Sequence, residues 1–254
     1  MRGQKDGLKI KQWLLKHEGC LPAAPGELIS DGLDNLQARM KEYFALGARF
    51  AKWRAVITIG DGIPTSRCIW ANAHALARYA AICQEAGIVP VVEPEVLLDG
   101  DHDIDTSFNV TESVLRTLMG QMADNHVSIE HTILKASMVI SGKDAKNRAS
   151  QAEVGARTLA CLKRTVPGAM PGIVFLSGGQ SDIDSAAHLN EMNLGKNNPW
   201  PLTFSYSRAL HFTALKVWKG KQENYKAAQA AFAHRCKMNS LASKGKWTLA
   251  AETA

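Results

Sequence analysis

The sequence of this 254-residue chain predicts an α/β fold of the TIM (β/α)₈-barrel class, because strand-like and helical segments alternate along it at a nearly constant spacing. Four apolar segments end in a polar residue, at Lys52, Glu93, Lys135 and Ser177, with intervals of 41, 42 and 42 residues. About 40 residues is the length of one strand–helix unit in such a barrel. A fifth strand-like run, PLTFSYSR, places Arg208 31 residues further on. Because the carboxyl ends of barrel strands meet at one mouth, these five residues predict a single active site.

Each element is predicted from its local pattern, and the stretch before residue 34 is predicted to be a turn-rich loop. Helical spacing of apolar residues over 34–46 and 71–86 ends at Gly47 and Gly87, since glycine most often terminates a helix. Strands alternating with helices imply a parallel sheet with right-handed crossovers. The other predicted elements are strands over 51–59, 89–92, 132–135, 173–176 and 202–206, and helices over 110–123, 151–164, 183–192 and 222–242.

The number of strands is the difficulty for a closed barrel. Five predicted strands lie between residues 51 and 206, whereas a closed barrel needs eight. Three further units would take roughly 120 residues, and only 50 residues precede the first predicted strand. The pattern therefore leaves two architectures open, an incomplete barrel and an open α/β sheet.

Composition and charge favour some classes of protein over others. Hydrophobic residues make up 46% of the chain and charged residues 21%, as in ordinary globular enzymes, and the apolar runs are too short to cross a bilayer. A formal net charge of +6 suits anionic ligands, phosphorylated metabolites first and nucleic acid second, although a solvated basic surface would give the same number. Five scattered cysteines and the lack of a secretory signal predict reduced thiols in a cytoplasmic compartment.

One histidine has an acidic surrounding that could suggest a metal. His102 lies between two aspartates in DGDHDID. This composition is more typical of a polar turn, and neither HExxH nor CxxC spacing occurs in the sequence. We therefore predict no metal site and no cofactor.

Lys135 is the sharpest chemical signal, because it lies within the apolar run HTILKASMVI. Desolvation disfavours the ammonium and favours a neutral amine that can attack a carbonyl. The plainer alternative is a lysine that reaches the strand end and supports an ion pair.

Paired charges follow two other strands. Glu93 and Glu95 flank a proline and share one face of a strand, so both carboxylates could serve the acid–base steps of imine formation. Lys52 and Arg54 likewise share a face, with Trp53 opposite, and two cations suit a phosphate or a developing negative charge. The alternatives are solvated loop glutamates and a solvated strand edge.

A candidate phosphate site follows the last two strands. Ser177, Gly178 and Gly179 end a strand and precede a helix, so their backbone N–H groups and the helix N-terminus could approach an anion. Arg208 holds the equivalent place one unit later, and a phosphate site after the last two strands recurs in this barrel.

Segments around these residues resemble the class I fructose-bisphosphate aldolases. They are FAKWRAVITIG, GIVPVVEPEVLLDGDHD, LKASMV, KRTVPGAMPGIVFLSGGQS and PWPLTFSYSRAL, and the resemblance runs in order from about residue 20 to residue 248. It implies metal-independent, reversible Schiff-base cleavage of fructose 1,6-bisphosphate to dihydroxyacetone phosphate and glyceraldehyde 3-phosphate, in glycolysis and gluconeogenesis. It also implies a cytoplasmic homotetramer with a sugar bisphosphate substrate and no nucleic-acid or membrane partner.

The resemblance gives each candidate residue a role. Lys135 corresponds to the Schiff-base lysine and Glu93 to the acid–base group of imine formation, with Glu95 in support. Lys52 is expected to stabilise charge around the cleaved C3–C4 bond. The expected phosphate ligands are Arg54 for the distal phosphate, and Ser177, Gly178, Gly179, Ser207 and Arg208 for the dihydroxyacetone phosphate half.

The chain departs from the family pattern at three places. Ala136 and Ser137 replace the Pro-Asn that is common after the lysine. Ser207 stands where many members have glycine, which matters if that position needs a positive φ. The C-terminal tyrosine of animal members is not found, so the preference for fructose 1,6-bisphosphate over fructose 1-phosphate stays open.

Two family strings from the front of the barrel are not in the sequence. They are GILAADES, which carries the base for the C4 hydroxyl, and GIKVDKG, which carries a lysine for the distal phosphate. We therefore expect an unmatched segment over residues 1–19 and one aldolase-like domain over residues 20–254 that contains strands 4 to 8 of the barrel. Two alternatives follow: a catalytically impaired aldolase fragment, and a non-catalytic protein that binds polyanions.

Overall fold

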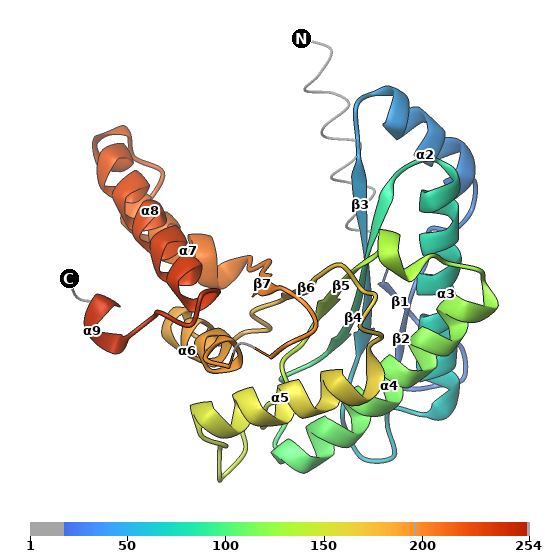
Figure 1. The fold of residues 1–254 in the computed structure, drawn as a ribbon, viewed down its shortest axis with the longest axis horizontal. Coiled ribbons are helices and arrows are strands. Elements are labelled where there is room, and N and C mark those ends of the chain that lie inside the picture. The colour runs from blue at the N-terminus through green and yellow to red at the C-terminus, as the bar shows by residue number, and fades with distance from the viewer. Residues whose placement is uncertain (1–17, 196, 253–254) are drawn as a thin grey trace.

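The computed structural model describes residues 18–195 and 197–252 of the chain (Figure 1). Its centre is a parallel sheet of five strands that lie in chain order. The strands are β3 (Phe50–Ile57), β4 (Val89–Val96), β5 (Ile133–Ala136), β6 (Ile173–Phe175) and β7 (Leu202–Phe204). Sequence order and parallel pairing agree with the predicted right-handed strand–helix units.

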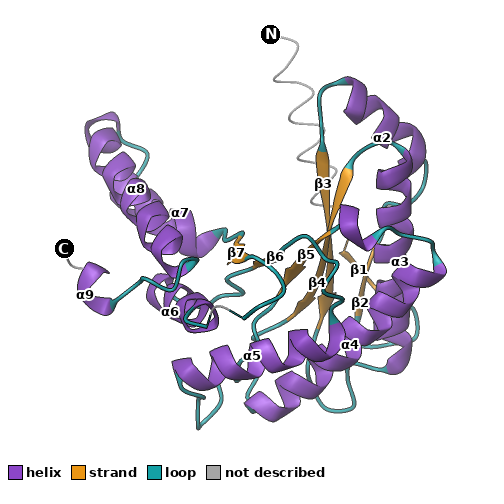
Figure 2. Cartoon of the chain, viewed as in Figure 1, coloured by secondary structure: helices purple, strands orange, loops and turns teal. Residues whose placement is uncertain are grey.

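Helices connect the strands and pack beside one another along one side of the sheet (Figure 2). Helix α3 contacts β3 and β4, and α3, α4, α5 and α6 form successive neighbouring pairs. Helices α7 and α8 form a separate antiparallel pair that extends from the β7 end (Figure 1). The helices are α2 (Leu36–Ala45), α3 (Ser66–Glu85), α4 (Ile104–Asp124), α5 (Gln151–Thr165), α6 (Asp182–Asn193), α7 (Arg208–Trp218), α8 (Tyr225–Ala242) and α9 (Leu249–Glu252), with short 3₁₀ turns η1 (Ile129–His131) and η2 (Gln222–Asn224).

The sheet does not close on itself within the described part of the chain. Strands β3 and β7 are its two edges, and each pairs with one neighbouring strand only. The core lies between the sheet and the helices, where Leu134, Ile173 and Phe175 are fully buried. In residues 18–195 and 197–252, no helix combines the length and apolarity that a membrane span requires.

Two helices begin earlier than their apolar pattern predicted, because polar residues cap them. Helix α3 begins at Ser66, where the Thr65 side chain accepts a hydrogen bond from the N–H of Cys68. Helix α4 begins at Ile104, where Asp103 accepts one from the N–H of Thr106. The predicted polar turn around His102 is therefore in part a helix cap.

Other elements were not predicted. Strands β1 (Glu18–Cys20) and β2 (Leu28–Ser30) form an antiparallel hairpin in the stretch that was predicted to be a loop, and three-residue strands are too short to show alternation. Helix α7 was also missed, although RALHFTALKVW carries apolar residues at helical spacing.

Candidate active site

Glu93 is the centre of a cluster of charged side chains on the sheet. Its carboxylate is 3% exposed and contacts two amines: Oε1 lies 2.9 Å from Nζ of Lys135, and Oε2 lies 2.5 Å from Nζ of Lys52. Three neighbouring strands position the three groups, since Lys52 lies on β3, Glu93 on β4 and Lys135 on β5. Lys135 is 12% exposed and Lys52 is 41% exposed, so the Schiff-base candidate is the shielded amine of the two.

Glu95 and Arg54 form a second ion pair on the same strands. Nε of Arg54 lies 2.5 Å from Oε2 of Glu95, and Nη1 lies 2.5 Å from Oε1 of Glu18 on β1. Partial burial opposes the charge on Arg54, but the hydrogen bonds and charges of Glu95 and Glu18 outweigh it and raise the pKa of the guanidinium. Arg54 is therefore held in place by two carboxylates that a phosphate would have to displace or share.

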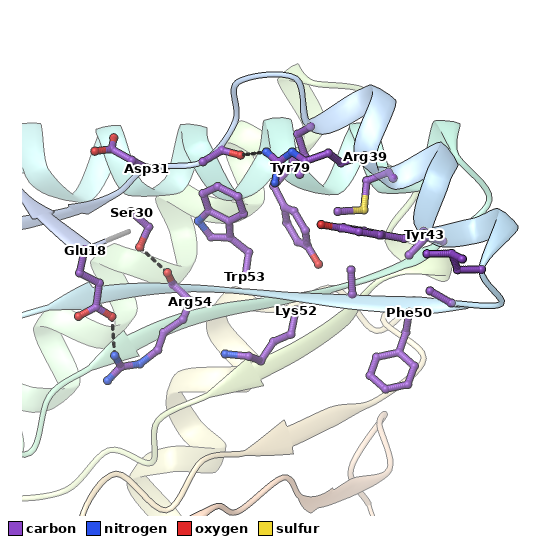
Figure 3. A pocket seen from close by; sticks show the side chains of 17 residues that line it. Glu18, Ser30, Asp31, Arg39, Tyr43, Phe50, Lys52, Trp53, Arg54 and Tyr79 are labelled. Carbon is purple, nitrogen blue, oxygen red and sulfur yellow. Dashed lines mark hydrogen bonds and ion pairs between the residues drawn. The ribbon is translucent and has the colours of Figure 1, made fainter. Parts of the chain in front are cut away.

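Lys52 and Arg54 point to one side of β3, and Trp53 points to the other (Figure 3). The ring of Trp53 packs against that of Tyr79, with centroids 5.4 Å apart. A cavity of about 810 Å³ adjoins this edge of the sheet and reaches Tyr43 on α2. Lys52 lines this cavity, whereas Glu93 and Lys135 do not, so the cavity meets the amine–carboxylate cluster only at Lys52.

Glu93 and Glu95 lie inside β4, whereas the sequence pattern predicted that the strand ends at Glu93. The strand continues through Pro94 to Val96 because β4 stays paired with β3 as far as Val96, although its pairing with β5 is limited to Val91 and Val92. Pro94 lies beyond those pairs, so its missing N–H costs no bond to β5. The charged cluster thus lies on the sheet surface as well as at the strand ends.

The candidate phosphate loop follows β6. Ser177 is buried, and Gly178 and Gly179 have φ values of +56° and +94°, which glycine adopts without strain. A Cβ placed on Gly179 would lie 3.6 Å from Nη2 of Arg208, so the guanidinium lies directly beside this loop. The structure therefore brings the two halves of the predicted phosphate site together.

Ser207 and Arg208 begin helix α7. Ser207 has a φ of −100°, so serine occupies this position without a left-handed conformation. The side chain of Ser207 makes no capping hydrogen bond to the first N–H groups of α7. The family's glycine is therefore not required here for backbone geometry.

Ser137, which stands where asparagine is common in the family, has a structural role beside Lys135. Ser137 is buried, and its Oγ donates a 2.9 Å hydrogen bond to the carbonyl of Val96. This bond connects the exit of β5 to the end of β4. It holds the two strands that carry Lys135 and Glu93.

Several residues near the site were not predicted from the sequence. Glu18 contacts Arg54 only because the β1–β2 hairpin brings it there, and nothing in EGC indicates this. Gln180 and His188 lie directly behind the phosphate loop, joined at 2.6 Å. A histidine on the apolar face of a helix, SAAHL, was the available signal for that pair.

A family comparison shows to which family the chain belongs. The family model described as "Fructose-bisphosphate aldolase class-I" matches residues 3–254. The chain belongs to the class I fructose-bisphosphate aldolase family. Members of this family are lyases, and the segments VEPE and FLSGGQS of this chain contain Glu93 and the loop described above.

Relatives and a solved structure agree with this assignment. A probable fructose-bisphosphate aldolase class 1 of Xanthomonas campestris is 56% identical over 255 residues, which cover 96% of this chain and 76% of that protein. A fructose-bisphosphate aldolase of Dictyostelium discoideum is 48% identical, over 95% of this chain and 67% of that protein. The aldolase of Plasmodium falciparum superposes with a TM-score of 0.90 at 44% identity, over 92% of this chain and 68% of that chain. The predicted (β/α)₈-barrel class is thereby confirmed, with five of its strands in the described sheet.

Proposed function

We propose that the amine of Lys135 forms a Schiff base with the C2 carbonyl of fructose 1,6-bisphosphate. One observation carries this proposal: a shielded amine lies 2.9 Å from a buried carboxylate, on adjacent strands of an aldolase fold. The amine adds to the carbonyl carbon to give a carbinolamine, which loses its hydroxyl as water to give an iminium. The iminium accepts the electron pair when the C3–C4 bond breaks, so the aldehyde half leaves and an enamine remains.

Glu93 is the proposed proton carrier of these steps. Its Oε1 is within hydrogen-bond reach of Lys135, so it can take a proton from the Lys135 ammonium, which frees the amine to attack, and later give that proton to the departing hydroxyl. Lys52, on the opposite oxygen of the same carboxylate, is more exposed and can turn toward negative charge that develops at C3 and C4. Glu95 supports this arrangement by holding Arg54.

The two phosphates are assigned to opposite ends of the site. Backbone N–H groups of Ser177, Gly178 and Gly179, the start of α7 and the guanidinium of Arg208 are proposed to bind the phosphate of the dihydroxyacetone phosphate half. Arg54 is proposed to bind the distal phosphate. No step requires a metal or a cofactor, because the iminium supplies the electron sink.

A second candidate is a chain that forms the imine but cleaves the bisphosphate slowly. Two observations favour it: both outer edges of the described sheet lack a partner strand, and neither GILAADES nor GIKVDKG is in the sequence. A missing C4-hydroxyl base would slow bond cleavage more than it weakens binding at the loop, since such a group acts mainly in the transition state.

Substitution of the lysine tests the proposal. Lys135→Arg keeps the charge and the length of the side chain, but arginine cannot provide a free amine at working pH. We expect cleavage of fructose 1,6-bisphosphate to fall below about 1% of the parent rate while the thermal transition is retained, because covalent catalysis is lost. A folded Lys135→Arg variant with substantial activity would show that Lys135 is not the nucleophile.

We further propose that the protein acts in the cytoplasm as a homotetramer, as the family resemblance implies. Sedimentation velocity of the purified chain tests the assembly, and a monomeric or dimeric species at working concentration would contradict it.

A further inference from the structure

His188 and Gln180 form a buried polar contact behind the phosphate loop. Nδ1 of His188, on helix α6, lies 2.6 Å from Oε1 of Gln180. His188 is 4% exposed and Gln180 is 9% exposed. The contact connects α6 to the residue that directly follows Gly179, so it gives the loop a buried side-chain support.

Gln180 also reaches the strand that carries the Schiff-base candidate. Its Nε2 donates to Sδ of Met138 at 3.6 Å, and Met138 follows β5. A thioether sulfur can only accept, so the amide nitrogen of Gln180 faces Met138 and the amide oxygen faces His188. His188 must then donate from Nδ1, which fixes the tautomer of the neutral ring.

The surroundings of His188 keep its ring neutral. Burial lowers the pKa of His188 to about 4, with Asp184 opposing and Arg148 adding to the effect. The Nδ1–H donor is therefore present without a charge across the neutral pH range. A neutral donor of this kind holds the Gln180 amide in place without adding a charge near the loop.

The backbone of Gln180 closes the turn that carries the loop. Its N–H donates to the carbonyl of Ser177 at 2.9 Å, and the two glycines between them have positive φ values. Glycines with so much conformational freedom do not maintain one loop geometry by themselves. The anchored side chain of Gln180 fixes one end of the turn, and Ser177 fixes the other.

We infer that His188 is a positioning residue for phosphate binding, which holds the Ser177–Gly179 loop in its anion-binding shape through Gln180. This inference rests on the proposed function, because it assumes that the loop binds the substrate's phosphate. His188 does not contact the substrate. Its effect is expected on the affinity for phosphorylated ketones and not on the chemistry at Lys135.

Borohydride trapping of two ketones separates these effects. Dihydroxyacetone phosphate and dihydroxyacetone form the same imine, but only the first carries a phosphate. The half-saturating concentration of each ketone is measured from the amount of reduced adduct on the full chain. The ratio of the value for dihydroxyacetone to the value for dihydroxyacetone phosphate is the phosphate advantage. His188→Leu removes the Nδ1–H donor and keeps a side chain of similar volume. Gln180→Leu removes the Oε1 acceptor of the same contact, at a position outside helix α6.

Asn190→Ala is the matched control. Asn190 is buried on the same helix, and its Oδ1 accepts from the N–H of Trp247 rather than from a residue of the loop. We expect the phosphate advantage to shrink about tenfold in His188→Leu, the effect of one lost buried hydrogen bond, and to stay at the parent value in Asn190→Ala. The double variant His188→Leu/Gln180→Leu should lose little more than either single variant, because both act through one contact.

The outcomes distinguish the two levels of the proposal. A parent chain without any advantage for the phosphorylated ketone would refute the phosphate role of the loop, and the inference with it. A clear parent advantage that His188→Leu keeps within twofold would refute the inference alone. If His188→Leu does not give a cooperative thermal transition, the same comparison on Gln180→Leu decides the question.

Discussion

Replacing Glu93 with glutamine perturbs the charged cluster at its centre and leaves the size of the side chain unchanged. In the parent chain, one buried carboxylate faces two ammonium groups at 2.5 and 2.9 Å. A carboxamide can accept from one amine, but it turns its NH₂ group toward the other. Glu93→Gln therefore leaves a shielded ammonium without a counter-charge and removes the proposed proton carrier.

The size of the effect follows from burial. Breaking a buried ion pair costs about 3–5 kcal/mol because the remaining charge stays desolvated. Lys135 is 12% exposed, so breaking its pair with Glu93 should cost most of this free energy. Lys52 is 41% exposed, so solvent screens its pair with Glu93, and that pair adds only ~0.5 kcal/mol. We expect a loss of about 3 kcal/mol in the free energy of unfolding, and imine formation slowed by about 100-fold through loss of general acid–base catalysis.

Glu95→Gln is the matched control for this experiment. It makes the same chemical change two residues away on the same strand, where the carboxylate pairs with Arg54 and not with Lys135. Urea unfolding measures stability, and the rate of borohydride-reducible adduct with dihydroxyacetone phosphate measures imine formation. The stability of both variants should fall, but only Glu93→Gln should form the imine slowly.

Equal trapping rates in the two variants, within about threefold, would refute the reasoning, since general acid–base catalysis contributes far more than that. Glu93 would then be a structural carboxylate, and another group would carry the protons.

Two further predictions concern the loop and its support. Burial lowers the pKa of His188 from 6.5 to about 4. As the pH falls, the unfolded chain therefore binds a proton at His188 near pH 6.5, whereas the folded chain binds it only near pH 4. The contribution of neutral His188 to the free energy of unfolding is complete above pH 6.5 and is lost as the pH falls toward 4. Between pH 7 and pH 5 this amounts to about 2 kcal/mol in urea unfolding, and a His188→Leu variant that loses as much would contradict it. Gly179→Ala forces a left-handed residue at φ +94°, which costs roughly 1–2 kcal/mol. It should raise the half-saturating concentration of dihydroxyacetone phosphate, and unchanged binding would show that the loop geometry does not matter.

The spacing of polar residues was enough to predict that Lys52, Glu93 and Lys135 lie close together. Parallel pairing of adjacent strands places Lys52, Glu93 and Lys135 on neighbouring strands, and an interval of one strand–helix unit is visible in the sequence. The depth of Glu93 in its strand was not predictable in this way. It depends on how far β4 stays paired with β3, which is a property of the sheet and not of VPVVEPEV.

Local sequence patterns could not predict contacts between elements that lie far apart in the chain. The partner of Arg54 on β1 depends on a hairpin of two three-residue strands. The contact between His188 and Gln180 depends on the rotation of α6 about its axis, because one face of that helix meets the loop. A buried histidine in an apolar helix face is visible in the sequence, but its partner is not.

The central claim is that Lys135 is the residue that bonds to the substrate. The direct measurement is to incubate the purified chain with dihydroxyacetone phosphate, reduce with borohydride, digest, and locate the adduct by mass spectrometry, with Lys52 as the internal comparison because it contacts the same carboxylate. We expect a single modified peptide that contains Lys135, and no adduct on Lys52. An adduct on Lys52 or another lysine, or none in a sample with a cooperative thermal transition, would contradict it.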